Sequence, residues 1–270
     1  MVSRFVYHAH AIGLSGHITK PIVRPIPSRA VSALSPGGGH STASHPGDEI
    51  EGIFSHRGAT SEARGAQNGN QCETLVTAMV KELRIEDKLS LDSCWMQLES
   101  VHSEGKQASI KPAGSFENLQ IAGRTIRLES RADIYNRLDT LEALSEQYKS
   151  DPEFRTQFLR EAFVGNEGAL LEKERKYFPW RQLQNPMELP VSRTGKTVVP
   201  LFAVLNPSEP GFHVSGNVIT VEDFGTIVLG ELTIGPHERR LTMLHAELGS
   251  PAEGFLIAAD GDGNGTNNDP

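Results

Sequence analysis

Alternation of apolar and polar residues is clearest between Asn217 and Leu248. Residues 226–234 are rich in aliphatic and β-branched side chains, residues 235–238 have the composition of a turn, and residues 240–248 alternate. A period of two sends successive side chains to opposite faces of a strand. The segment therefore predicts an antiparallel hairpin. Its second strand would direct one set of side chains to a single face: Thr242, Leu244, Ala246 and Leu248.

Further β-type runs occur along most of the chain. Short strands are predicted at 4–10, 16–20 and 28–34, long ones at 74–85 and 88–102, a hairpin at 115–128, and a return to strands at 197–204 and 212–221. One run is ambiguous, because Leu75, Met79 and Leu83 also lie at helical spacing. Helix therefore remains an alternative for 74–83.

A different periodicity separates these β blocks. Residues 131–149 carry apolar side chains at helical intervals, namely Ile134, Leu138, Leu141, Leu144 and Tyr148. Asp151-Pro152-Glu153 then supplies an N-cap, a first-turn proline and an acidic residue for a second helix. A third helix is expected at 169–176. These helices predict an insertion at about 131–178 in a β protein.

Two segments in the N-terminal part have loop composition. Residues 35–47 read SPGGGHSTASHPG, and residues 61–71 are similarly poor in large apolar side chains, so both are expected to be exposed loops. The resulting division has N-terminal strands with a flexible segment at 1–71, a β domain with its helical insertion at 72–259, and a polar tail at 260–270. The predicted fold is mainly β, with antiparallel sheets forming a sandwich or a barrel-like arrangement. A β-solenoid is the alternative.

Composition narrows the choice of partners. Lys and Arg number 26 against 34 Asp and Glu, for a net charge of -8, which argues against a nucleic-acid surface. No apolar run approaches the roughly 20 residues that a membrane helix needs. The first 21 residues lack the basic and apolar regions of a signal peptide, so a cytoplasmic location or export by a non-classical route is expected.

Cys72 and Cys94 are the two cysteines, and buried reduced thiols are favoured over a single bridge.

Four stretches together resemble a known group of proteins. These are the β run from Cys72, GSFENLQIAGRTI, VEDFGTIVLGEL and LTMLHAELGSPAEG. Over residues 72–129 and 197–254 the chain resembles bacterial β-rich proteins of unknown function, including the choice-of-anchor P type domains. The resemblance implies a structural or adhesive β module and carries no functional residues. The helical insertion and the missing export signal depart from that group.

The clearest candidate for metal chemistry is near the C-terminus. Asp260, Asp262 and Asn264, with Gly265, match the first half of a calcium loop, D-x-D-x-N-G, in which alternate hard oxygens converge on one ion. The bidentate carboxylate six residues later is missing, so another carboxylate would have to replace it. Calcium is therefore the cofactor considered, and a flexible polar tail is the alternative.

A second candidate lies at the other end of the chain. His8 and His10 would share one face of a strand, and neutral imidazoles two residues apart can chelate zinc or copper. No acidic ligand lies at a diagnostic spacing, so a surface strand with titratable histidines is the default interpretation.

No complete catalytic signature accompanies these residues, and a small-molecule substrate is not expected. Gly195-Lys196-Thr197 resembles the end of a phosphate loop, but residue 190 is Pro where that loop needs Gly. The favoured hypothesis is a non-enzymatic structural protein that assembles as a homo-oligomer through exposed strand edges, at the N-terminus and at residues 226–234. The alternative is a metal-dependent enzyme that uses the N-terminal histidines.

Overall fold

The computed structural model describes residues 4–103, 106, 108–155, 196–235 and 238–268. The chain is mainly β and its strands pair antiparallel in two large sheets, as the sequence predicts. The first sheet has the order β15-β16-β17-β18-β19-β1-β2, and β13 pairs beside β16 on β17. Its strands are β1 (Arg4–Lys20), β2 (Arg24–Ala33), β13 (Thr197–Pro200), β15 (Phe212–Ser215), β16 (Val218–Val221), β17 (Gly225–Ile234), β18 (Arg239–Leu248) and β19 (Glu253–Asn268).

The second sheet is a meander centred on two long strands. β7 (Gln71–Ile85) pairs with β8 (Leu89–Ser103), β6 and β9 flank this pair, and β3 pairs with the outer side of β6. Shorter strands continue both flanks. The remaining members are β3 (Gly39–His45), β4 (Asp48–Ile50), β5 (Phe54–His56), β6 (Gly58–Asn68), β9 (Ser109–Glu117), β10 (Gln120–Ile121) and β11 (Arg124–Thr125).

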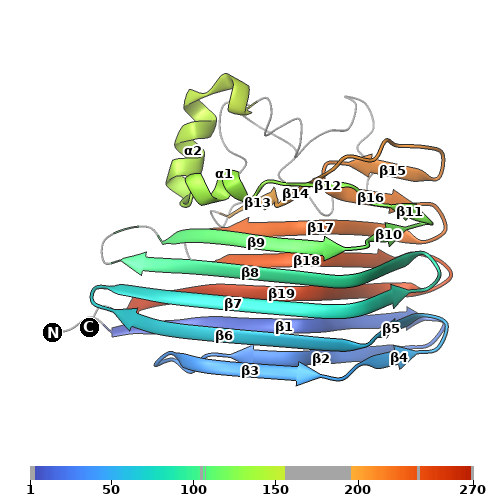
Figure 1. Ribbon diagram of the computed structural model, residues 1–270, viewed down its shortest axis with the longest axis horizontal. Coiled ribbons are helices and arrows are strands. Elements are labelled where there is room, and N and C mark those ends of the chain that lie inside the picture. The colour runs from blue at the N-terminus through green and yellow to red at the C-terminus, as the bar shows by residue number, and fades with distance from the viewer. Residues whose placement is uncertain (1–3, 104–105, 107, 156–195, 236–237, 269–270) are drawn as a thin grey trace.

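The two sheets stack face to face as a sandwich, with β1, β18 and β19 behind β6, β7 and β8 (Figure 1). Neither sheet closes on itself, and the stacked arrangement is not a solenoid. One continuous apolar core fills the space between the sheets, including Leu14, Val76, Met96, Leu241 and Leu256. Both cysteines are free and buried, Cys94 in this core and Cys72 in a small cluster with Phe5 and Tyr7.

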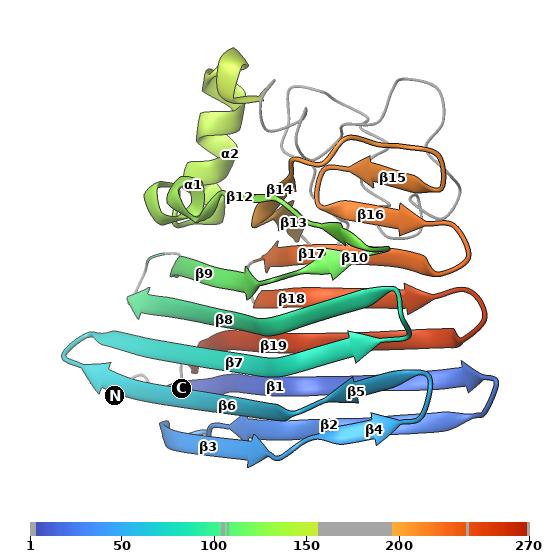
Figure 2. The same cartoon turned by 45° about the vertical axis from the view of Figure 1, so that its right-hand side comes forward.

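The strands of both sheets bend in the middle, as Figure 2 shows for β6, β7 and β8. Residues with positive φ lie at the bend in alternate strands of the first sheet: Ala30 at 49°, Gly230 at 63° and Ala259 at 51°. Glu82, at 49°, has the same place in β7. The bend interrupts the period of two, so β7 buries even-numbered residues up to Val80 and then Leu83 and Ile85.

The same bend changes the predicted faces of β18. Strict alternation predicts that Met243 points away from Leu244, but both are fully buried. The position of the hairpin is confirmed, since β17 and β18 pair from Gly225↔Leu248 to Ile234↔Arg239. β7 is a strand, so the helical alternative for 74–83 is wrong.

The N-terminal part is built into both sheets and is not a flexible arm. β1 forms one unbroken strand where two were predicted, and it lies between β19 and β2. Most of each segment predicted as a loop is strand, β3 within 35–47 and β6 across 58–68. Small side chains explain β6, because Ala59, Ser61 and Ala63 are buried at every second position.

Helices follow the second sheet, as predicted, but the first one is interrupted. α1 (Ala132–Arg137) and α2 (Leu141–Ser150) replace a continuous helix, and the Thr140 side chain caps α2 by accepting from the Ala143 N–H. Tyr135, Leu144 and Tyr148 are buried. β12 (Leu128–Ser130) pairs with β14 (Phe202–Val204) beside them. The helix predicted at 169–176 and most of the one from Asp151 lie outside the described residues.

Candidate functional site

Strand pairing brings the two predicted metal-binding sets together on one face of the first sheet. β1 and β19 run antiparallel, with His8 opposite Asn264 and His10 opposite Asp262. Asp260 follows on the same face, opposite Ile12. Residues directly opposite each other in an antiparallel pair have their side chains on the same face. The sequence identified both sets but gave no sign that they are neighbours.

The predicted polar tail is therefore the second half of a central strand. Asp260, Asp262 and Asn264 belong to β19, whose two neighbours are β1 and β18. Alternate residues of a strand lie about 6.6 Å apart, at roughly 3.3 Å per residue, so these side chains do not wrap around one point as in a calcium loop. The loop geometry on which the calcium prediction depends is absent from this segment.

The intervening glycines have a packing role. They face the second sheet, where a Cβ on Gly261 would lie 3.0 Å from Val76 and 3.1 Å from Met96. A Cβ on Gly265 would collide with the Phe5 ring. The DGDGNG sequence thus presents its acids outward and uses glycine where the other sheet approaches closely.

Asp260 is the centre of a charged network on the outward face. Its side chain is 2% exposed, and Arg240 holds it with two hydrogen bonds, from Nε to Oδ1 at 2.8 Å and from Nη2 to Oδ2 at 2.9 Å. The Thr242 hydroxyl also donates to Oδ1 at 2.6 Å. Both partners are on β18, in register with β19, so the network ties two central strands together. This carboxylate is already satisfied by protein groups.

Two further carboxylates, those of Asp262 and Glu231, lie near Arg240. Neither receives side-chain hydrogen bonds comparable to those of Asp260. Burial raises the pKa of Asp262 to about 6, against the attraction of Arg240. Its Oδ1 is buried and has no hydrogen-bond partner. Burial also raises the pKa of Glu231, which lies opposite Thr242 on β17. The Arg240 guanidinium therefore lies near three carboxylates on this face, those of Asp260, Asp262 and Glu231. Its two hydrogen bonds both go to Asp260.

Sequence reasoning missed a second polar cluster, which lies between the sheets. Thr74 and Ser100 face each other on β7 and β8, with a hydrogen bond of 2.5 Å between their hydroxyls, and both hydroxyls lie within hydrogen-bond distance of the Gly263 carbonyl. His102 lies 3.3 Å from the Ser100 hydroxyl. Burial, and then the charge of Arg239, lowers the pKa of His102 to about 4. Since isolated hydroxyls in a strand pattern resemble surface residues, no sequence signal marks this cluster.

Arg239 extends the same region toward β19. It is 5% exposed and donates from Nη1 to Asn264 Oδ1 at 3.0 Å. The predicted calcium residue Asn264 is thus engaged by an arginine, as Asp260 is. Of the five predicted site residues, two are held by cations, Asp262 is partly buried beside Arg240, and His8 and His10 line the neighbouring strand.

A third group of interest lies where the two sheets meet at β2 and β4. A small pocket there is lined by residues 46–49 and 55–57. His56 is 2% exposed, and its ring centroid is 5.7 Å from that of His45. No pattern in the sequence indicates that these two histidines lie together.

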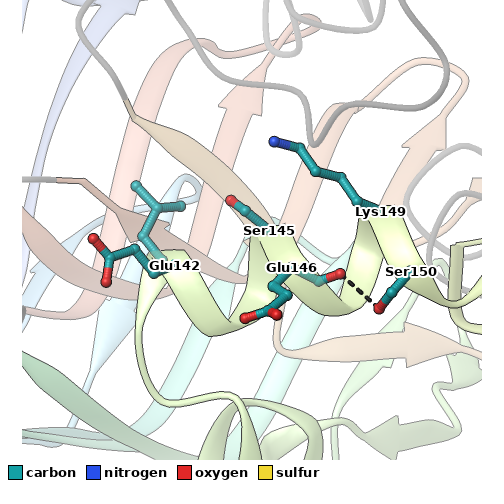
Figure 3. Close-up of a pocket in the computed structure, with 6 residues that line it drawn as sticks. Glu142, Ser145, Glu146, Lys149 and Ser150 are labelled. Atoms are coloured by element: carbon teal, nitrogen blue, oxygen red, sulfur yellow. Dashed lines mark hydrogen bonds between the residues drawn. The ribbon is translucent and has the colours of Figure 1, made fainter.

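The larger depression follows one side of α2 (Figure 3). Glu142, Ser145, Glu146, Lys149 and Ser150 line it, together with Leu141. Ser150 donates its hydroxyl to the Glu146 carbonyl at 2.8 Å, which is a bond within the helix. All these groups come from one face of a single helix.

No group of three or more His, Cys, Asp or Glu side chains is arranged to hold a metal ion within the described residues. Neither described helix is long and apolar enough to cross a membrane.

The fold is an antiparallel β-sandwich, and the polar groups of the candidate site bind mainly to one another. The chain belongs to the family described as Domain of unknown function (DUF8256), whose model matches residues 5–235. The sandwich extends beyond that match, because β18 and β19 are central strands of the first sheet. No curated protein and no solved structure matches the chain.

Proposed function

We propose that this protein is a non-enzymatic structural β module that assembles with copies of itself through the edge of β3. The edges named from the sequence need correction first. β1 is flanked by β19 and β2, and β17 by β16, β13 and β18, so neither is an open edge. The edges of the described sheets are β2, β13 and β15 in the first sheet, β3, β4, β9 and β11 in the second, and both strands of the small β12-β14 sheet.

Most of these edges carry features that discourage pairing with another chain. Proline, charge and short length all protect a sheet edge. β2 contains Pro25 and Pro27, and β9 contains Lys111 and Pro112. The Ile110 N–H of β9 donates to the Asp139 carbonyl beside α1. The other edges are short: β4, β12 and β14 have three residues each, β13 and β15 have four, and β11 has two.

β3 differs from all of them. Its sequence GHSTASH has seven residues with neither proline nor Asp, Glu, Lys or Arg, and alternate side chains are exposed. It pairs with β6 along its whole length, from Gly39↔Gly65 to His45↔Ala59, and no strand among the described residues pairs with its other side. An unpaired edge of this kind offers main-chain donors and acceptors to an added strand. This edge is the observation that carries the proposal.

A second copy of the chain fits this edge because β3 is compatible with itself. In antiparallel pairing about a two-fold axis at Thr42, each Thr42 faces its copy and His40 faces Ser44. No like-charged carboxylates or lysines then meet across the new pair, which would otherwise be destabilising. The net charge of -8 opposes association over longer distances, so salt should favour the assembly.

Matched lysine substitutions test the proposal. Thr42→Lys would place two cations opposite each other at the two-fold axis. Thr60→Lys makes the same change at an exposed site on β6, one strand further in. In analytical ultracentrifugation at physiological salt, the native chain and Thr60→Lys should associate with rising concentration, and Thr42→Lys should stay monomeric. A native chain that is monomeric at every soluble concentration would overturn the proposal, as would equal association of the two variants.

A further inference from the structure

An ion pair links the two sheets where β2 faces β4. Arg29 of β2 donates to Asp48 Oδ2 of β4, from Nη2 at 2.6 Å and from Nε at 3.2 Å. Their side chains are 29% and 25% exposed, so water screens the pair only in part. Burial alone would raise the pKa of Asp48, but hydrogen bonds from Arg29 and the Glu49 N–H hold it below its usual value. The pair therefore persists in moderately acidic solution.

His56 lies buried beside this ion pair, and neither ring nitrogen has a side-chain hydrogen-bond partner. The Gly58 backbone favours the charged ring, but burial outweighs it. The ring stacks on Phe54, with the ring centroids 5.9 Å apart. Buried polar groups without partners are uncommon and costly in folded proteins. Here the cost is limited because a neutral imidazole behaves largely as an aromatic ring against Phe54.

The charges around His56 come from every neighbouring element. Arg29 on β2 and His45 on β3 oppose a positive charge, and Asp48 on β4 favours one. Glu49 and Arg57 line the same pocket. Because Arg29 already neutralises Asp48, and Glu49 and Arg57 offset each other, no carboxylate is left over for an imidazolium. Burial removes water from the ring, and this loss of solvation is the main cause that lowers the pKa of His56.

We propose that protonation of His56 opens the contact between β2 and β4 and loosens β3, β4 and β5 from the sandwich. The added cation would be buried and would lie beside Arg29, which opposes it. Local opening costs less free energy than global unfolding, because β4 and β5 have three residues each and pair over few positions. The device is a local acid-sensitive closure, and it does not depend on self-assembly.

Hydrogen exchange resolves this opening from global unfolding. Amides in residues 39–56 should exchange faster at pH 5 than at pH 7, after correction for the intrinsic rate, by up to about tenfold for each unit of pKa difference. Amides of β7 and β8 should remain protected under the same conditions. Equal protection of residues 39–56 at both pH values would overturn the proposal.

Variants separate His56 from other titrating groups. His56→Phe keeps an aromatic ring against Phe54 and cannot be protonated, so it should abolish the acid-induced opening. His40→Gln removes an exposed histidine of β3 that pairs with Glu62, and should leave the opening unchanged. NMR titration of the native His56 ring provides the check if His56→Phe does not fold. Protonation of His56 at a pH where residues 39–56 are still protected would contradict the proposal.

Discussion

His10 on the first described strand lies directly opposite Asp262 on the last one. Arg240 is opposite the same aspartate on the other side. Asp262 therefore has an imidazole and a guanidinium as cross-strand neighbours, yet one of its oxygens has no hydrogen-bond partner. Its neighbour Asp260 takes both strong hydrogen bonds of Arg240. The two aspartates are alike in sequence, but we expect substitutions of them to have opposite effects.

Replacing Asp260 by Asn should destabilise the fold. The change weakens two charge-assisted hydrogen bonds from Arg240 and one from Thr242, which are worth more than neutral ones. Since Arg240 is 41% exposed, water compensates part of the loss, and we expect a decrease of about 1–3 kcal/mol in the free energy of unfolding. Urea denaturation at pH 7 measures it. An unchanged midpoint would contradict this assignment.

Replacing Asp262 by Asn should stabilise the protein, and only at higher pH. The folded-state pKa of about 6 is above the ordinary value of 3.8, so the ionised carboxylate costs stability above pH 6. That cost disappears as the pH falls toward 4, where the folded protein takes up the proton. We expect a gain of about 1–3 kcal/mol at pH 8 and almost none at pH 4, measured by urea denaturation at both pH values. A gain that is independent of pH would show that the charge is not its cause.

Replacing Gly261 by Ala should also destabilise the sandwich. The added methyl group would press on Val76 and Met96 across the core, and overpacking of this kind costs about 1–3 kcal/mol. Gly58→Ala is the control, because the nearest atom to its new methyl group is 3.9 Å away. Thermal unfolding of the two variants should differ by several degrees. Equal melting temperatures would mean that the sheets are spaced further apart than described.

Calcium should not change the stability of the native chain. The oxygens of the DGDGNG segment are spread along β19, and two of its three polar side chains bind arginines. Melting curves with calcium and with a chelator should therefore coincide. A higher melting temperature in calcium alone would show that an ion binds elsewhere or that β19 rearranges to hold it.

The fold class could be predicted from the sequence because apolar and polar residues alternate in the long strands. Residues 74–85, 88–102 and 240–248 alternate over enough positions to be recognised, and they form β7, β8 and β18. Alternation failed for β3 and β6, because the half-buried positions of β3 include Ser41 and Ala43 and the buried positions of β6 include Ala and Ser in place of large apolar residues. A strand packed against a close neighbour needs small side chains, and such strands resemble loops in composition.

The candidate site was predictable residue by residue but not as an arrangement. His8, His10, Asp260, Asp262 and Asn264 were all identified from local spacing. Their proximity depends on the pairing of β1 with β19, for which no local signal exists. The role of Arg240 was hidden for the same reason, since a charged residue at the start of a strand resembles any surface cation. Register between distant strands decides which groups meet, and local pattern does not encode it.

The position of β19 has a consequence for how the molecule is made. During synthesis β1 leaves the ribosome well before its partner β19, so β1 must wait with one side unsatisfied. Pairings between such distant segments form slowly. A nascent chain therefore offers β1 to any competing strand until β19 emerges, and holding β1 apart is a task well suited to a chaperone.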